Sequence, residues 1–519
     1  MSVNLFKIRR TRPGRSWRCR LAGVTAVVAA LALAPAASAN GWSLQSVPNE
    51  PFTTIDGLSG VSCSSTANCF AVGFDTEGGQ EGFLVEHYNG SSWAVQTFAG
   101  PSGTSSSGLQ GVSCPTASFC MAVGEYTPAG DGELPLVFTY NGSSWTQQNL
   151  PLTASEHVDL SGVSCTSATF CMAVGGFPGD TTTAWSWNGS SFTQQRTSGF
   201  PPADFTSVSC TSSTFCMAAG WASLALAPGL VDPFTETYNG SSWSIPNGAL
   251  NPDNGNATNS LLTGVACVST SDCQAAGRYF ANSSGPFTFG LSYNGSTWTQ
   301  QSTPPTGTHA AFGNAGAVAC AGASLCWAVG DYTQSSGTQQ VLADYWGGSS
   351  WELATLPDPS GTNPSLQAVA CPTSSDCEAV GSYVNTSGRL APFAEQYTFT
   401  FSFPCCSTFT PHHFALSVRG VERHGATITA VLHKPRTLTL LVQAVRNGRQ
   451  IIDGLVPLGS HPAGTSKIHW NLRVNGRLLG KGTYKVSLHS VTGDVLSPAT
   501  PPGEITLTVK ANRRVHVGK

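Results

Sequence analysis

The chain has 519 residues, and its formal net charge of −3 conceals two parts of opposite sign. Residues 40–409 carry three basic side chains against 24 acidic ones, a formal charge of −21, whereas residues 410–519 carry 15 basic against four acidic, a formal charge of +11. The length is too great for one hydrophobic core and suits one large repeat domain plus a smaller domain. The acidic part repels phosphate backbones, so nucleic acid is excluded as an expected partner.

Residues 1–39 are predicted to be a secretory signal peptide. Seven basic residues between Lys7 and Arg20 precede a run rich in Ala, Val and Leu at residues 21–35, and Ala37-Ser38-Ala39 has the small-x-small form of a cleavage site. We therefore expect a mature, secreted chain that starts at Asn40. No later run is long and apolar enough to span a bilayer. The mature chain is predicted to lack a transmembrane segment and to be extracellular or associated with the cell wall.

A unit of 45 to 57 residues occurs seven times in residues 40–404. Each unit contains a version of L-x-G-V-S-C, five residues, C-x-A-V-G, a variable stretch, an apolar strand that ends in Tyr, and the turn N-G-S-S followed by Trp. Aromatic and β-branched residues punctuated by Gly and Asn predict four short strands in every unit. In the first unit they are expected at residues 58–63, 69–74, 83–89 and 92–98. Asn-Gly between two such strands predicts a type I′ hairpin turn, because both residues tolerate the positive φ that this turn requires.

Repeats of about 50 residues with four antiparallel strands are typical of β-propeller blades, and seven lies in their usual range. We therefore predict an all-β chain whose residues 40–404 form a seven-bladed β-propeller. The last unit lacks its N-G-S-S-W phrase, while the mature chain begins N-G-W-S-L. We predict that residues 42–47 supply the outer strand of the seventh blade. The alternating residues 398–403 are the competing source of that strand.

The paired cysteines of the repeat are predicted to form disulfides. Zinc sites use tighter C-x2-4-C spacing with a second pair or with histidines, and no His recurs in phase with these cysteines. A five-residue link between adjacent strands brings two Cβ atoms within bridging reach, and export favours oxidation. The expected pairs are Cys63 with Cys69, Cys114 with Cys120, Cys165 with Cys171, Cys210 with Cys216, Cys267 with Cys273, Cys320 with Cys326, and Cys371 with Cys377.

The motif S-C-x-x-x-x-x-C-x-A-V-G, as it recurs from Asn40 to about Phe403, resembles the repeat of secreted bacterial β-propeller proteins. The resemblance is specific for architecture, and it implies little about activity.

The sequence pattern changes after residue 404. A linker is predicted at residues 405–410, residues 437–442 alternate as a strand, and residues 467–486 contain a version of W-[DN]…G-x-x-L-x-x-G-x-Y-x-V. This pattern resembles the Ig-like domain of flagellar hook-capping proteins. The resemblance implies a two-sheet β-sandwich over residues 411–510 that acts as a spacer or assembly module without catalysis. Residues 511–519 form a basic tail.

One cluster, Cys405-Cys406 followed by His412-His413, has the residue types of metal ligands. Adjacent cysteines seldom both bind one ion in good geometry, so a junction disulfide or a vicinal pair is favoured over a metal site. We expect neither a metal nor another cofactor.

Antiparallel order places the C-x5-C links and the N-G-S-S turns on one face of the ring. The links after A-V-G and the links between units fall on the other face, and they differ in length and content. We call this second face the variable face, and variable loops on a rigid scaffold are where binding is normally placed. The candidate ligand-binding residues there follow A-V-G: Glu125, Tyr126, Trp221, Arg278, Tyr279, Asp331, Tyr332 and Tyr383. The alternative interpretation is that the aromatic members cap the hydrophobic cores of the blades.

Catalytic motifs such as a nucleophile elbow, a zinc-protease helix or a phosphate loop are absent from the sequence. The sequence therefore favours a secreted, non-catalytic protein that recognises an extracellular glycan or protein through the variable face. The basic C-terminal domain would act as a spacer, or as an electrostatic tether to an anionic cell-wall polymer or to the acidic ring of another copy. The alternative is a polysaccharide hydrolase or lyase that uses acidic residues of the same face, with Glu125, Asp331 and Arg278 as first suspects.

Overall fold

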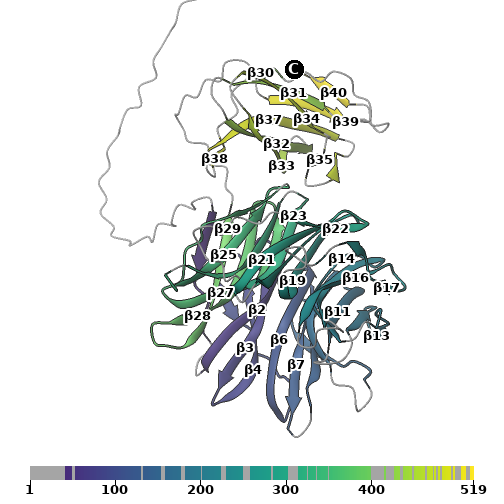
Figure 1. Ribbon diagram of the computed structural model, residues 1–519, viewed down its shortest axis with the longest axis vertical. Coiled ribbons are helices and arrows are strands. Elements are labelled where there is room, and N and C mark those ends of the chain that lie inside the picture. Colours follow the sequence, from purple (N-terminus) through teal and green to yellow (C-terminus); the bar gives the residue numbers. More distant parts are fainter. Residues whose placement is uncertain are drawn as a thin grey trace, which may run out of the picture. The chain divides into compact units, whose positions relative to one another are not determined.

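The computed structural model describes residues 41–398, apart from 50–52, 130–131, 153–157, 177–181, 200–201, 224–229, 249, 251–256, 282–283, 302–313, 324, 335 and 349, and a set of strands between residues 414 and 518. These residues are all-β, as predicted, and no helix occurs among them. Seven antiparallel sheets of four strands form the blades of a β-propeller (Figure 1). The predicted signal peptide and the Cys405, Cys406, His412 and His413 cluster lie outside the described residues.

Each blade runs from an inner strand through a second and a third strand to an outer strand. The inner strands of blades one to seven are β2 (Thr53–Ser65), β6 (Thr104–Thr116), β10 (Asp159–Ser167), β14 (Ala203–Ser212), β19 (Ala257–Ser269), β23 (Asn314–Gly322) and β27 (Gly361–Thr373). The second strands are β3 (Asn68–Glu77), β7 (Phe119–Pro128), β11 (Phe170–Gly176), β15 (Phe215–Ser223), β20 (Asp272–Ala281), β24 (Leu325–Thr333) and β28 (Asp376–Asn385).

The third strands are β4 (Gln80–Tyr88), β8 (Leu134–Tyr140), β12 (Thr183–Trp187), β16 (Val231–Tyr238), β21 (Ser284–Tyr293), β25 (Gln339–Trp346) and β29 (Leu390–Thr398). The outer strands are β5 (Trp93–Val95), β9 (Trp145–Gln148), β13 (Phe192–Gln195), β17 (Trp243–Ser244), β22 (Thr297–Gln301), β26 (Trp351–Leu353) and β1 (Gly41–Gln45). Blade five carries an additional edge strand, β18 (Asn247–Gly248), parallel to β22. Neighbouring inner strands contact one another all round the ring, including β27 against β2.

The L-x-G motif, or the residues that replace it in blades four, six and seven, forms a β-bulge in every inner strand. The register against the second strand shifts by one residue between Leu58 and Gly60, and again at the equivalent place in the other six blades. A Cβ added at Gly60 would lie 2.9 Å from the carbonyl oxygen of Gln110 in the next inner strand. Glycine at this position therefore lets two inner strands approach closely.

The glycine of A-V-G is required because the inner strand approaches the second strand closely at this point. A Cβ added at Gly73 would lie 1.9 Å from the carbonyl oxygen of Gly57, the residue before L-x-G, and the equivalent approach recurs in five other blades. The two motifs are therefore coupled, because the bulge directs a backbone carbonyl at the glycine of the neighbouring strand.

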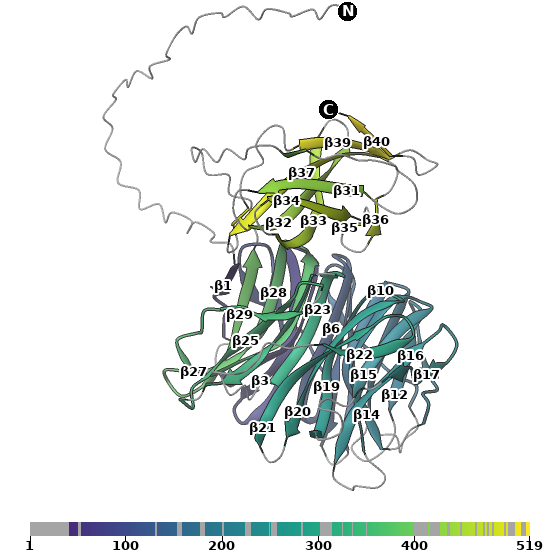
Figure 2. The same cartoon turned by 45° about the horizontal axis from the view of Figure 1, so that its top comes forward.

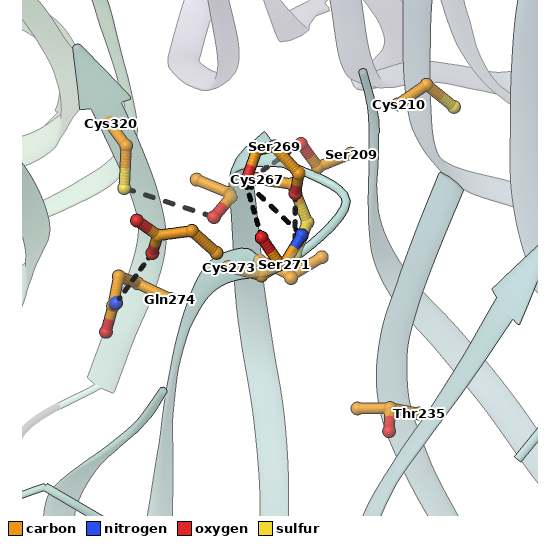
Figure 3. Close-up of a disulfide and its surroundings, with 12 residues drawn as sticks. Ser209, Cys210, Thr235, Cys267, Ser269, Ser271, Cys273, Gln274 and Cys320 are labelled. Atoms are coloured by element: carbon orange, nitrogen blue, oxygen red, sulfur yellow. Dashed lines mark hydrogen bonds between the residues drawn. A yellow bond between two sulfur atoms is a disulfide. The ribbon is translucent and has the colours of Figure 1, made fainter. Parts of the chain in front are cut away.

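Seven disulfides join the inner and second strands, in the predicted pairs, with Cα–Cα distances of 3.9 to 4.1 Å. Figure 3 shows the bridge of blade five, between Cys267 and Cys273. The backbone N–H of Cys267 donates to Oγ of Ser209 in blade four at 2.9 Å. The same bond recurs at the three preceding boundaries, from Cys114, Cys165 and Cys210 to the serine before the cysteine of the preceding blade. Blades five to seven have alanine at this serine position.

The N-G-S-S turn differs from the predicted type I′ geometry. In the first unit, Oδ1 of Asn89 accepts hydrogen bonds from the backbone N–H groups of Ser91 and Ser92 and from Oγ of Ser91, at 3.0, 3.1 and 2.7 Å. Gly90 has φ +90°, whereas Asn259 and Asn363 are the only described non-glycine residues with positive φ. The turn is thus a four-residue loop held by an asparagine side chain, which satisfies the loop donors without positive φ at Asn89.

The two faces of the ring are arranged as predicted. A Cβ added at Gly90 in the turn would lie 2.7 Å from the Cβ of Ala67 in the C-x5-C link, so these two connections pack together on one face. The links from second to third strand, and those between blades, lie at the opposite ends of the strands because the four main strands of a blade are antiparallel to their neighbours. The aromatic residue after the turn is buried in blades one to six, as in Trp93 and Trp298, which are 5% and 2% exposed.

Hydrophobic cores lie between neighbouring blades. One buried cluster joins Phe70 and Val85 of blade one to Leu109, Phe138 and Trp145 of blade two, and similar clusters recur round the ring. Each blade is therefore stabilised by its neighbours.

The ring is closed by its first strand. β1 pairs antiparallel with β29, with Trp42 opposite Tyr397 and Gln45 opposite Ala394, and Figure 2 shows the two strands side by side. The prediction that the N-terminal segment supplies the outer strand of blade seven is confirmed. The ring of Trp42 lies 5.1 Å from that of Trp327 in blade six. The competing residues 399–403 lie outside the described residues.

The described part of the C-terminal region is also all-β. A three-stranded sheet contains β30 (Phe414–Ala415), β31 (Ala426–Leu432) and β34 (Gly464–Trp470). A larger sheet contains β33 (Arg449–His461), β32 (Arg436–Arg446), β37 (Gly482–Thr492), β39 (Glu504–Val509) and β40 (Val515–Gly518), with β38 (Val495–Leu496) on β37, and β35 (Arg473–Val474) pairs with β36 (Arg477–Leu478). The Ig-like assignment of this region stays a prediction.

Candidate functional site

The residues that follow A-V-G lie on strands rather than in loops. The second strands of six blades continue past this motif, because their ladders with the inner and third strands continue there. The first residue after A-V-G is directly opposite the residue before L-x-G, so the two side chains share a face of the blade. The pairs for blades one to seven are Phe74 and Gly57, Glu125 and Gly108, Gly176 and Asp159, Trp221 and Asp204, Arg278 and Leu261, Asp331 and Asn314, and Ser382 and Ser365. We call these fourteen residues the variable layer.

Contacts within the variable layer cross from one blade to the next. Oγ of Ser365 in blade seven donates a hydrogen bond to Oδ1 of Asp331 in blade six at 2.8 Å. A Cβ added at Gly176 in blade three would lie 2.4 Å from Oδ1 of Asp204 in blade four. At these two boundaries the layer therefore consists of pairs from neighbouring blades, and the glycine of blade three makes room for the acidic side chain of blade four.

Three acidic side chains of blades two, three and four interact with one another. They are Glu125, Asp159 and Asp204, and we call them the acidic row. Burial raises the pKa of Glu125 to about 6; a hydrogen bond from Nε2 of Gln110 at 3.2 Å opposes this shift, and the negative charges of Asp159, Glu133 and Glu81 add to it.

The other two members show the same effect of burial. Burial, with the charge of Asp159, raises the pKa of Asp204 to about 7, against a hydrogen bond from the backbone of Phe205. Burial also raises the pKa of Asp159, although the backbone N–H of Gly176 donates to its Oδ1 at 3.2 Å. Near neutral pH the row therefore contains groups that both donate and accept protons.

The structure does not bring together the acids that the sequence nominated as a pair. Glu125 belongs to the acidic row between blades two and three, whereas Asp331 is buried at the boundary of blades six and seven and bonded to Ser365. Arg278 lies on the second strand of blade five. Trp221 is directly opposite Asp204, so its half-buried indole lies on the same face as the acidic row.

The nominated tyrosines pack mainly on blade cores. Tyr126 contacts the cluster that contains Leu109 and Phe138. The rings of Tyr279 and Phe287 lie 5.4 Å apart, and those of Tyr383 and Phe393 lie 5.8 Å apart. Tyr332 is half-buried, directly opposite Gln340 of β25. The arrangement of the first three tyrosines agrees with core capping.

Asp159 and Asp204 were not nominated from the sequence. Both precede the L-x-G motif, whereas the nominated residues all follow A-V-G. Aligned across the seven units, the position before L-x-G varies as Gly57, Gly108, Asp159, Asp204, Leu261, Asn314 and Ser365. This variation at one position of an otherwise repeated motif could have identified Asp159 and Asp204 as candidate site residues.

Among the described residues, no group of three or more His, Cys, Asp or Glu side chains is arranged to hold a metal ion. Nor does that part of the chain contain a helix able to cross a membrane.

No protein-family model matches the chain, and no curated protein matches it. Among solved structures it is similar to YCF48 bound to D1 peptide, at 13% identity and a TM-score of 0.44, over 70% of this chain and 99% of the other. It is also similar to a lectin of Aleuria aurantia in complex with α-methyl-L-fucoside, at 14% identity and a TM-score of 0.32, over 60% and 98%. An ulvan lyase of family PL25 matches at 10% identity and a TM-score of 0.41, over 68% and 93%. Similarity this distant carries no argument about a ligand.

Proposed function

We propose that the chain is an extracellular, non-catalytic binding protein that recognises a glycan or a protein through the variable face of its propeller. One observation supports this location above others. The disulfide links and asparagine turns of the opposite face repeat with little change, whereas the variable layer presents different chemistry at each blade boundary. Variation on a rigid scaffold is typical of recognition surfaces.

The acidic row sets the chemistry of the proposed ligand. Carboxyl groups accept hydrogen bonds from sugar hydroxyls, and they also pair with ammonium or guanidinium groups of a protein. Trp221, beside Asp204, offers a flat apolar surface on which a sugar ring or a planar side chain can stack. All of these side chains project from strands, so little conformational freedom is lost on binding.

The experiment is a screen of the full-length mature protein against glycan and peptide arrays, followed by titration of the best ligand with three variants. Asp204→Asn and Trp221→Ala are expected to weaken binding by about tenfold or more, the effect of losing a charged hydrogen bond or a buried aromatic contact. Glu352→Gln is the matched control, because Glu352 is an exposed acid on outer strand β26. Equal affinity in all three variants would contradict the proposed location.

A second candidate function is a polysaccharide hydrolase or lyase. The observation that favours it is the raised pKa of Glu125 and Asp204, since an acid catalyst must hold its proton near neutral pH. Release of reducing ends or unsaturated sugars from wall polysaccharides would identify it. Product formation that is abolished by Glu125→Gln or Asp204→Asn supports an enzyme, whereas binding without product supports the leading proposal.

We also propose that the basic C-terminal region tethers the protein to an anionic wall polymer. Its formal charge of +11 supports this role, because a basic region attracts an anionic polymer. Salt screens this attraction. Retention of the full chain on isolated cell walls should fall steeply as salt is raised. Retention that does not change with salt would contradict the tether.

A further inference from the structure

Blade seven is built differently from the other six blades. Its outer strand β1 and its third strand β29 come from opposite ends of the propeller sequence, so the ring is closed by non-covalent contacts alone. The six other blades have an outer strand that follows directly from their own third strand. Whatever weakens the pairing of β1 with β29 therefore acts on the closure of the whole ring.

Two fully buried carboxyl groups lie beside this closing strand. Glu378 on β28 and Glu395 on β29 are both 0% exposed. Glu378 is opposite Gln396, and Glu395 is opposite Ala379, so the two side chains lie on opposite faces of blade seven. Both boundaries of this blade, with blade six and with blade one, thus contain a buried acid.

Glu378 is connected to the closing strand through one glutamine. Nε2 of Gln45 on β1 donates to Oε1 of Glu378 at 3.4 Å, and Oε1 of Gln45 accepts a hydrogen bond from Nε1 of Trp93 in blade one at 2.6 Å. The other carboxyl oxygen, Oε2, is buried and receives no hydrogen bond from the part of the chain that the structure describes. Gln45 therefore joins the two sides of the boundary where the ring closes.

Glu395 is directly opposite Leu44 of β1, and no donor among the described residues reaches either of its buried carboxyl oxygens. Blade four provides a matched comparison, because Glu236 also lies two residues before the tyrosine that ends the third strand and is also 0% exposed. Glu236 receives two hydrogen bonds from Ser198, from the backbone N–H at 3.0 Å and from Oγ at 2.8 Å. Blade seven therefore lacks the donors that hold the equivalent carboxyl group in blade four.

Apart from Gln45, whose hydrogen bond lowers the pKa of Glu378, the groups that interact with these two carboxyls would not stabilise a negative charge. Glu378 interacts with Asp376 on its own strand and with Tyr88 from β4 of blade one, and Glu395 interacts with Asp358 from the link between β26 and β27. Burial, with the charge of Asp376, raises the pKa of Glu378 to about 9, and burial, with the charge of Asp358, raises the pKa of Glu395 to about 8. An ionised carboxyl left in such surroundings is strongly destabilising.

We propose that blade seven is an alkali-sensitive closure: the ring stays closed while Glu378 and Glu395 carry protons, and β1 separates from β29 when the two carboxyl groups ionise. Separation rehydrates both carboxylates and breaks the bridge that Gln45 makes to Trp93. It also exposes β29 as an unpaired edge strand. This closure does not depend on which ligand the variable face binds.

The test is hydrogen exchange of the full-length protein, followed by mass spectrometry, across pH values from neutral to about two units above it. Protection is corrected for the intrinsic effect of pH on amide exchange. In the wild type, peptides that cover β1 and β29 should lose protection as pH rises, by up to about tenfold per pH unit for each carboxyl group that is still protonated in the closed ring. The loss should level off above about pH 8 for Glu395 and about pH 9 for Glu378, whereas peptides of blades two to four keep their protection. The double variant Glu378→Gln and Glu395→Gln should keep blade seven protected over the whole range.

Glu236→Gln is the control, and it should leave the wild-type response of blade seven unchanged. If the double variant does not fold, Glu395→Gln alone gives a second measurement. In that variant only Glu378 should still contribute to the loss of protection in blade seven as pH rises. The proposal is wrong if the double variant loses protection as the wild type does, or if all blades lose protection together.

Discussion

The side chain of Asp204 in blade four fills the space beside Gly176 of blade three, since a Cβ added to the glycine would lie 2.4 Å from Oδ1 of the aspartate. The acidic row depends on this arrangement, since a larger residue at 176 would displace the carboxyl group from its neighbour Asp159. Glycine at this position is therefore part of the candidate site, although it has no side chain of its own.

Gly176→Ala is expected to destabilise the propeller by about 1–3 kcal/mol, the usual cost of forcing extra volume into a packed place. Denaturant unfolding measures the change. The double variant Gly176→Ala with Asp204→Ala should recover part of the loss, because the clashing oxygen is gone. Gly347→Ala is the control, since its nearest contact would be an ordinary 3.4 Å to the ring of Tyr345. Full stability of Gly176→Ala would show that Asp204 moves away freely.

Asp344 on β25 should give the propeller a stability that falls as pH rises. Burial raises its pKa from 3.8 to about 7, so its stabilising contribution is complete below about pH 4 and is lost as pH rises to about 7. The loss is about 4 kcal/mol at most, at roughly 1.4 kcal/mol per pKa unit. Unfolding free energies of Asp344→Asn, measured across this range, should lack this part of the slope. Glu352→Gln, an exposed acid, should retain it, and parallel curves for all three proteins would contradict the assignment.

Asn89→Ala is expected to destabilise blade one by about 1 kcal/mol, because the loop donors of Ser91 and Ser92 lose their acceptor in an exposed turn. Asn89→Asp keeps the acceptor oxygen, so its effect should be clearly smaller. Thermal unfolding of the two variants side by side measures the difference. If aspartate is as harmful as alanine, the side-chain oxygen is not what holds the loop.

Ser209→Ala removes the acceptor of the backbone N–H of Cys267 and should cost about 1–3 kcal/mol, the penalty for a buried donor left without a partner. The reverse change, Ala319→Ser in blade six, tests whether the same bond can be added where the sequence lacks it. Denaturant unfolding with the disulfides intact compares the two variants. Equal stability of Ser209→Ala and the wild type would mean that water replaces the serine.

The repeat alone predicted the number of blades, the disulfide pairs and the closing segment. The first two follow from the spacing of the repeated residues, and the third follows because unit seven lacks a turn phrase that is present at the start of the mature chain. It did not predict the bulge at Leu58 to Gly60, which inserts one residue and changes which side chains share a face. For this reason Asp159 and Asp204 were overlooked, although the variation before L-x-G was visible. The asparagine turn was also mispredicted, since the dipeptide Asn-Gly does not reveal that the side chain of Asn89 replaces a backbone partner.

Closure by β1 has a consequence for the order in which the chain can fold. Oγ of Ser43 donates to the carbonyl oxygen of Gln396, a contact across 353 positions of sequence. Contacts this distant form slowly, because a long loop must be closed before they contribute any stability. β1, the first strand of the propeller to be synthesised, therefore stays without its partner until β29 has been made, and the closing pair is the last of the ring to become available.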